Sequence, residues 1–197
     1  MTSPENHIST EVIHIKNMVC SCCKIFLQEK LEDSGVKVHE MSLGKARISF
    51  DTKKITLEEI KAILQRYGFD LLRNKEDKLV ADIKVAVIEL IHHLNNVNSI
   101  VRKSDYIVEK LGFSYQYLSK TFSEHEHITL EKYIIAQKIE RIKHMLDNDE
   151  YSLSEIAYMM DYSSVQYLSN QFKKMTGITV SQYKRGDEVG KNPIDEI

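Results

Sequence analysis

Three cysteines lie within four positions near the start of the chain, at Cys20, Cys22 and Cys23. Thiolate sulfur is a soft donor that favours Cu(I), Zn and similar ions. A loop that reverses and enters a helix can bring Cys20 and Cys23 to one ion, and the dipole at the start of that helix lowers a thiol pKa. Cys22 is either a third ligand or an outward-facing bystander. The cluster indicates a metal site or thiol redox chemistry rather than a structural disulfide.

A second set of polar side chains belongs to a segment that the chain contains twice. Ser114–Phe122 matches Ser164–Phe172 at an offset of 50 positions, and the match continues to Tyr133 and Tyr183. Roughly nine of about twenty aligned positions are identical, and self-similarity at a fixed spacing indicates a duplicated structural unit.

The sequence pattern of each copy predicts two short helices joined by a tight turn, which is a helix-turn-helix. The helices are expected over 107–111 and 115–122 in the first copy, and over 153–160 and 164–174 in the second. Gly112 and Asp161 occupy the turns, where Gly and Asp best tolerate a left-handed backbone.

The second helix of each copy has one apolar edge and one polar face. Leu and Phe lie four residues apart at 118 and 122, and again at 168 and 172, so each pair shares the buried side. Short hydrogen-bonding side chains on the other face are of the type that reads base edges in a major groove, although they could also serve only to solvate the helix. The candidate DNA-binding residues are Tyr115, Gln116, Ser119, Lys120, Ser164, Gln166, Ser169, Asn170, Lys173 and Lys174.

A long helix is expected between the two copies. Over Leu130–Leu146, the apolar residues at helical spacing are Tyr133, Ile134, Ile139, Ile142 and Met145. A rigid spacer would present both recognition helices to one face of DNA, where successive major-groove entries are about 34 Å apart.

The region before the repeat alternates between strand and helix patterns. Strands are expected over Glu11–Asn17, Val36–Met41, Ala46–Phe50 and Phe69–Leu72, with helices from Ile25 to Leu31 and from Leu57 to Leu64. Thr56 and Glu59 have the spacing of a capping box. The order βαββαβ is that of a ferredoxin-like sandwich, so the expected class is α+β.

Between these regions, the spacing of apolar residues over 75–95 predicts one helix. Its apolar face contains Leu79, Ile83, Ala86, Val87, Leu90 and Leu94, and interrupting charges favour packing or a dimer seam over a membrane helix. The expected domains are a ferredoxin-like domain over 1–73, a connector helix over 74–96, an all-helical double helix-turn-helix domain over 97–185 and a flexible tail over 186–197.

The composition limits the classes of function. The chain has 197 residues, with 27 basic and 29 acidic side chains and a net charge of −2. Near-neutral charge predicts few phosphate contacts, hence weak DNA binding by a monomer and help from dimerisation. No apolar run of about twenty residues and no export signal is present, so we expect a cytoplasmic protein without membrane contact. Nucleotide-binding loops and catalytic triad or paired-carboxylate patterns are missing, which argues against an enzyme.

Residues 99–185 resemble the AraC/XylS family of bacterial transcription regulators. The resemblance rests on Leu153–Ala157, Tyr162–Ser164, Tyr167–Ser169, Phe172–Lys174, Gly177–Ser181 and Tyr183–Arg185. Asp161 stands where the family usually has Gly, and Val180 where it usually has Pro. The first copy lacks the basic tail of the second and carries Ser123–His127 instead. The resemblance implies binding to double-stranded DNA. The family leans toward activators, and an activator would also contact RNA polymerase.

Residues 11–72 resemble the heavy-metal-associated domain. The motif Met-x-Cys-x-x-Cys is present as Met18–Cys23, and Tyr67–Phe69 matches the turn beside the metal loop. Asn17 stands where Gly is more usual, and Cys22 is additional. The resemblance implies that Cys20 and Cys23 bind Cu(I) or another soft ion such as Zn or Cd.

These observations predict a transcription regulator that responds to a soft metal ion. Metal binding would order the cysteine loop and shift the connector helix, which could also form a homodimer seam. The alternatives are that the N-terminal domain senses redox state or serves only as a dimer or interaction module. The chain as a metal carrier is a further alternative.

Overall fold

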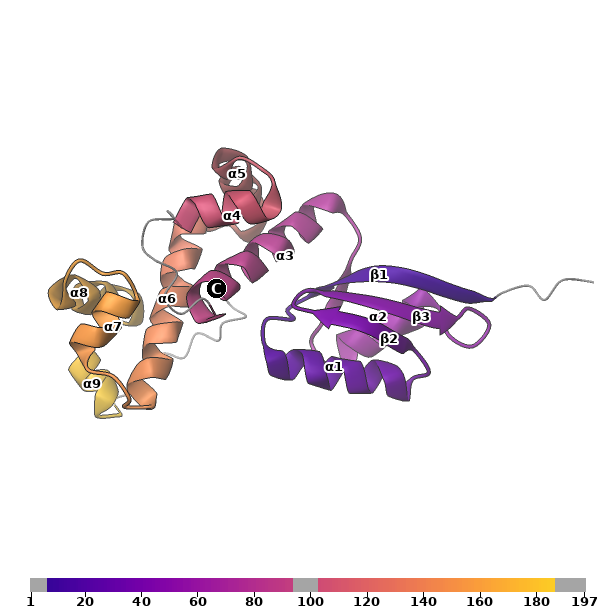
Figure 1. Cartoon of the computed structure of the whole chain (residues 1–197), viewed down its shortest axis with the longest axis horizontal. Helices are drawn as coiled ribbons and strands as arrows, with labels where there is room; N and C mark the ends of the chain where they lie inside the picture. Colours follow the sequence, from indigo (N-terminus) through magenta and orange to yellow (C-terminus); the bar gives the residue numbers. More distant parts are fainter. Residues whose placement is uncertain (1–6, 94–102, 187–197) are drawn as a thin grey trace, which may run out of the picture. The chain divides into compact units, whose positions relative to one another are not determined.

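The computed structural model describes residues 7–93 and 103–186. The chain divides into two compact units, Met1–Val85 and Ala86–Ile197. A four-stranded sheet with helices forms the first unit and the second is helical, which confirms the predicted α+β class (Figure 1). No helix among the described residues is long and apolar enough to cross a membrane.

The first unit alternates strands and helices. Its elements are β1 (Ile8–Lys16), α1 (Ser21–Asp33), β2 (Lys37–Ser42), β3 (Lys45–Asp51), α2 (Leu57–Arg66), β4 (Asp70–Leu72) and the larger part of α3 (Lys75–Ile88). The sheet order is β2-β3-β1-β4, and all neighbouring strands are antiparallel. In the register, His14 of β1 lies opposite both Lys45 of β3 and Leu72 of β4.

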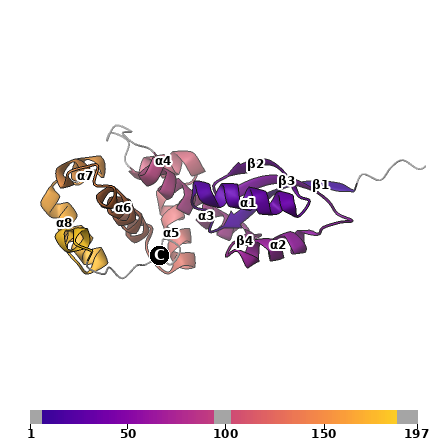
Figure 2. The ribbon, with the colours of Figure 1, turned by 90° about the horizontal axis from the view of Figure 1, so that it is seen from below.

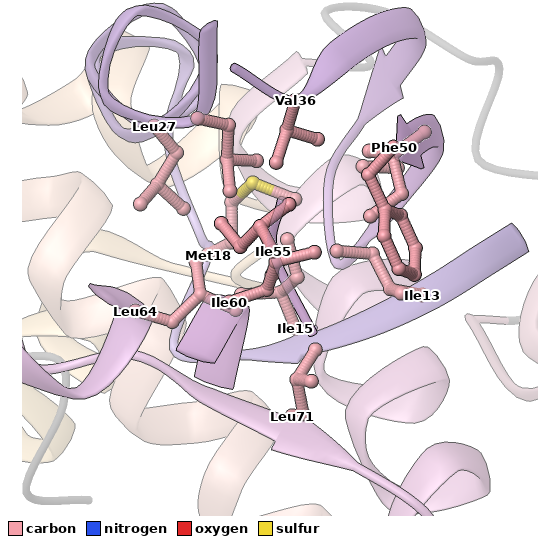
Figure 3. Close-up of a cluster of buried hydrophobic side chains, with 13 residues drawn as sticks. Ile13, Ile15, Met18, Leu27, Val36, Phe50, Ile55, Ile60, Leu64 and Leu71 are labelled. Atoms are coloured by element: carbon pink, nitrogen blue, oxygen red, sulfur yellow. The ribbon is translucent and has the colours of Figure 1, made fainter. Parts of the chain in front are cut away.

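Helices α1 and α2 pack on the same face of this sheet, because residues from both share one hydrophobic core with the strands (Figure 3). Ile15 of β1, Leu27 of α1 and Leu64 of α2 are almost completely buried. Burial of each such side chain contributes about 1.5–3 kcal/mol. Met18 is only 1% exposed, so the core anchors the chain two residues before Cys20.

The second unit consists of helices. They are the π-helical turn η1 (Glu89–His93), α4 (Lys103–Leu111), α5 (Tyr115–Glu126), α6 (Leu130–Asp147), α7 (Leu153–Met159), α8 (Val165–Thr176) and α9 (Val180–Lys184). Figures 1 and 2 show the long helix α6 between the α4–α5 pair and the α7–α8 pair. Both α5 and α8 contact α6.

The helix expected over 75–95 does not continue in one conformation. The α-helix ends at Ile88 and the π-helical turn η1 follows it. Ile88 and Ile91 are buried, whereas Leu90, expected on the buried face, is only half-buried. Leu94 and the predicted tail from 187 onward lie outside the described residues.

The expected buried face of α6 also differs from the structure. Ile134 is half-buried, and the buried residues include Gln137 and Lys138. The physical reason is that helices pack on more than one side of α6, so its buried surface is wider than a single apolar stripe.

The two recognition-helix candidates end at equivalent positions with a left-handed backbone. This residue is His127 after α5, with φ 57°, and Gly177 after α8, with φ 81°. Glycine adopts this conformation freely, whereas a side chain with a Cβ atom is strained there.

We expect His127→Gly to raise the free energy of unfolding by about 1 kcal/mol, because it relieves this strain. The reverse change, Gly177→His, should lower the free energy of unfolding by a similar amount. Urea unfolding followed by far-ultraviolet circular dichroism measures both. A His127→Gly variant no more stable than the unaltered chain would contradict the strain at this position.

Candidate nucleic-acid interface and thiol site

The first turn of α1 holds two of the three cysteines in contact. Cys20 is the N-cap residue, and its Sγ accepts a hydrogen bond from the backbone N–H of Cys23 at 3.3 Å. The two sulfur atoms, Cys20 Sγ and Cys23 Sγ, are 2.9 Å apart, and all three cysteines are free of disulfides. Cys22 is exposed, and its Sγ has no hydrogen-bond partner among residues 7–93 and 103–186.

Burial changes the acidity of Cys23. It raises the pKa of Cys23 above its usual value, and the hydrogen bond with Cys20 acts in the same direction. The sequence-based expectation that the helix dipole lowers the thiol pKa is therefore wrong for Cys23. Metal binding at Cys23 must displace a proton at neutral pH.

Asn17 fastens the cysteine loop to the turn after α2. Its backbone is left-handed, with φ 67°, a conformation that Asn tolerates better than most residues. Its Nδ2 atom donates to the carbonyl oxygen of Gly68 at 3.1 Å. The neighbouring ring of Tyr67 meets Phe26 of α1 edge-on, with ring centres 5.0 Å apart. Asn in place of Gly thus keeps the backbone turn and adds a hydrogen bond.

Helices α5 and α8 begin in the same way. Ser114 caps α5 by accepting from the N–H of Tyr117 at 3.3 Å, and Ser164 caps α8 by accepting from the N–H of Tyr167 at 3.1 Å. A serine at this position satisfies a backbone donor that the helix cannot pair. Ser164, a predicted DNA-binding residue, therefore has a structural role, and its hydroxyl can still donate one hydrogen bond.

The two helices also bury the same edge. The buried pairs are Leu118 with Phe122 and Leu168 with Phe172, each 0% exposed. The Phe122 ring packs on Tyr133 in a tilted arrangement with centres 5.1 Å apart, and the Phe172 ring meets Tyr183 edge-on with centres 5.6 Å apart. These equivalent ring pairs fix which face each helix presents to solvent.

The predicted DNA-binding residues fall into two groups. The exposed ones are Gln116, Lys120, Ser164, Gln166, Asn170, Lys173 and Lys174, and the half-buried ones are Ser119, Ser169 and Tyr115. The Tyr115 hydroxyl donates to Glu131 Oε1 at 2.8 Å, and burial together with this bond raises the pKa of Tyr115. This hydroxyl connects α5 to α6.

The structure pairs two of these residues on α8. Gln166 Nε2 donates to Asn170 Oδ1 at 3.0 Å across one helical turn. Within residues 7–93 and 103–186, the carbonyl of Gln166 and the amide N–H groups of Asn170 have no partner, so the pair presents both an acceptor and donors. The major-groove edge of adenine, with its N7 acceptor and N6–H donor, calls for this combination.

Charge distinguishes the two copies. Lys173 and Lys174 are exposed near the end of α8 and have no ion-pair partner in the described part of the chain. At the equivalent place in α5, Glu124 lies 3.8 Å from Lys120 and offsets its charge. The surface around α8 is therefore the more attractive of the two for phosphate.

Known sequences support this geometry. Residues 107–186 match the family model described as a helix-turn-helix domain. This part of the chain is therefore similar in sequence to known helix-turn-helix domains.

Curated relatives of the chain are regulatory proteins by name. The xylose operon regulatory protein of Escherichia coli K12 is 32% identical over 99 residues, which are 50% of this chain and 25% of the relative. The Msm operon regulatory protein of Streptococcus mutans is 25% identical over 124 residues, 63% of this chain and 43% of the relative. The F1 operon positive regulatory protein of Yersinia pestis is 30% identical over 89 residues, 45% of this chain and 30% of the relative. The chain thus spans a quarter to less than half of these relatives. No solved structure matches it significantly.

Lys138 stabilises the turn of the second helix-turn-helix. Helix α7 ends with hydrogen bonds from the N–H of Asp161 to Tyr158 and from the N–H of Tyr162 to Ala157. Lys138 of α6 is 9% exposed, and its Nζ donates to the carbonyl of Met160 at 2.9 Å. Lys138 is not among the residues predicted from the sequence, although a lysine beside Ile139 within an apolar stripe is a signal of such a role.

We expect Lys138→Met to lower the free energy of unfolding by about 1–3 kcal/mol, because it leaves a buried carbonyl without its donor. Lys132→Met is the matched control, since Lys132 lies on the same helix and is exposed. Urea unfolding measures both variants. Equal stability of the two would show that the Lys138 hydrogen bond contributes nothing.

Proposed function

We propose that the chain is a transcription regulator of the AraC type that binds double-stranded DNA through α5 and α8. One observation carries the proposal: two helices 50 positions apart have the same serine cap and bury the same leucine and phenylalanine edge. Two helices with the same cap and the same buried edge can make two equivalent contacts in successive major grooves of one duplex. The helix-turn-helix match and the names of the relatives support it.

The two recognition helices contribute differently in this proposal. Lys173 and Lys174 of α8 bind phosphates, and the Gln166–Asn170 pair reads base edges. Gln116, Ser119 and Lys120 of α5 add contacts with weaker electrostatic attraction. Ser169 completes the polar face of α8. The net charge of −2 keeps the monomer's affinity low, so a homodimer through the connector helix would strengthen binding, and RNA polymerase is the further partner of an activator.

The double variant Lys173→Ala/Lys174→Ala should bind a duplex more weakly and with a flatter salt dependence. Each lost phosphate contact lowers the slope of log affinity against log salt by about 1. Fluorescence anisotropy of a labelled duplex, selected by the unaltered chain from a random pool, measures this slope.

The matched control is Lys53→Ala/Lys54→Ala, which removes the same charge from an exposed turn of the first unit. We expect this control to bind almost like the unaltered chain. Identical slopes for both double variants would exclude Lys173 and Lys174 from the phosphate contacts.

We further propose that residues 1–73 form a ferredoxin-like domain of the heavy-metal-associated kind, and that Cys20 and Cys23 bind a soft ion such as Cu(I), Zn or Cd. The sheet order β2-β3-β1-β4 and the sulfur pair beside the core-anchored Met18 support this proposal. Two thiolates suit Cu(I), which accepts few soft ligands. Among residues 7–93 and 103–186, no three His, Cys, Asp or Glu side chains gather as ligands, so the proposal assigns no role to Cys22.

Metal binding requires the sulfur pair to open. An ion held by both residues would need their sulfur atoms further apart than the 2.9 Å between Cys20 Sγ and Cys23 Sγ. Rotation of the exposed Cys20 side chain would supply this movement and weaken its hydrogen bond with the Cys23 N–H. Any metal response therefore begins at the N-terminus of α1, and from there we propose that it reaches the connector helix over 74–96 and the DNA-binding domain over 97–185.

An anaerobic Cu(I) competition titration tests the metal proposal. The full chain should bind about one ion tightly, and Cys20→Ser/Cys23→Ser should lose this binding because sulfur supplies both ligands. Cys22→Ser is the matched control and should bind like the unaltered chain. Equal binding by all three would place the ion elsewhere.

The 2.9 Å sulfur separation also favours a second candidate function for the same pair, redox sensing. Oxidised glutathione can accept two electrons from the two thiols, which gives a Cys20–Cys23 disulfide and two molecules of reduced glutathione. Titration with a glutathione redox buffer, followed by thiol counting, distinguishes this candidate from metal binding. A pair that stays reduced across the buffer range excludes it.

A further inference from the structure

Two large aromatic side chains outside the predicted DNA-binding set lie at equivalent positions of α5 and α8. Tyr117 is 46% exposed and Tyr167 is 55% exposed. Each is the third residue of its helix, and its backbone N–H is bound by the cap serine. Neither hydroxyl has a hydrogen-bond partner among residues 7–93 and 103–186. The duplication has thus kept an uncovered tyrosine at the start of both recognition helices.

Each tyrosine ring rests against an aromatic ring from the preceding turn. The ring centres of Phe113 and Tyr117 are 5.3 Å apart, and those of Tyr162 and Tyr167 are 5.8 Å apart. Contacts of this kind favour particular ring orientations. The turn of each helix-turn-helix therefore directs the tyrosine that follows it.

The pair in the second copy has additional support from α6. Lys138 Nζ lies 4.8 Å from the centre of the Tyr162 ring, within the range of a cation–π interaction. Its hydrogen bond to the Met160 carbonyl fixes this ammonium group, and burial raises the pKa of Tyr162 to about 12, so that hydroxyl stays neutral. In the first copy, Phe113 is 45% exposed and no described ammonium group lies over its ring.

Tyr167 also lies on the face of α8 that the proposed function directs toward DNA. Positions 167, 170 and 174 follow each other at helical spacing, so Tyr167 shares a face with Asn170 and Lys174. Tyrosine hydroxyls donate to phosphate oxygens, and the start of a helix favours a negatively charged partner. A phosphate at this end would receive the free hydroxyl and cover the exposed ring.

We propose that the Tyr167 hydroxyl donates a hydrogen bond to a DNA phosphate at the N-terminal end of α8, and that Lys138 positions Tyr167 through the Tyr162 ring. The inference rests on the proposed function, because it presumes that α8 contacts DNA. It adds a phosphate contact from a neutral side chain and a positioning role for a buried lysine that touches no DNA.

The test is duplex binding by the full chain, measured by anisotropy with a duplex that the unaltered chain selects from a random pool. Tyr167→Phe keeps the ring and removes only the hydroxyl, so we expect affinity to fall about fivefold to tenfold. The slope against salt should not change, because a neutral donor releases no counterion. The thermal midpoint should also not change, because the hydroxyl has no partner within the described protein.

Tyr67→Phe is the matched control. Tyr67 is 44% exposed and also paired with an aromatic ring, but it belongs to the first unit. It should leave affinity unchanged. If the unaltered chain selects no duplex, the proposed function fails. If it selects one and Tyr167→Phe binds equally well, only the present inference fails.

The positioning role of Lys138 requires a separate comparison. Lys138→Met should weaken duplex binding at a temperature where the variant is fully folded, and Lys138→Arg, which keeps the cation, should restore most of the affinity. In the Tyr167→Phe background, Lys138→Met should have a much smaller effect on binding. Equal effects in both backgrounds would overturn the positioning role.

Discussion

The packing of two phenylalanine-containing edges around one long helix is the constraint on which the DNA-binding unit depends. Phe122 and Phe172 are both fully buried, and each meets a tyrosine 11 residues further along the chain. This packing sets the rotation of α5 and α8 about their own axes. Rotation decides which side chains face solvent, so the polar surface of each helix follows from its apolar edge.

The two copies share this apolar packing, but the exposed side chains of α5 and α8 differ. Both copies keep the serine cap, the buried pair and the exposed tyrosine, which are the parts that set geometry. The second copy carries Lys173 and Lys174, and the ammonium group of Lys138 from α6 lies over the Tyr162 ring in its turn. The first copy has Glu124 next to Lys120. The α8 surface therefore carries more uncompensated positive charge than the α5 surface among the described residues.

Sequence patterns predicted most of the fold because the periodicity was strong. The alternation of strands and helices, the capping box at Thr56 and the left-handed Asp161 all appear in the structure. Side-chain relationships across the fold were less predictable. Local spacing cannot show that Lys138 reaches the end of α7, or that burial raises the pKa of Cys23. Exposed Tyr167 was missed because aromatic residues at helical spacing usually indicate core.

The sulfur of Cys20 has two roles that compete with each other. It caps α1 by accepting a hydrogen bond from the N–H of Cys23, and it is more exposed than the sulfur of Cys23. A reaction or ligand that turns this sulfur away competes with its hydrogen bond to that amide. The chemical state of the Cys20 thiol is therefore coupled to opening of the first turn of α1. Hydrogen exchange at the Cys23 amide reports this coupling.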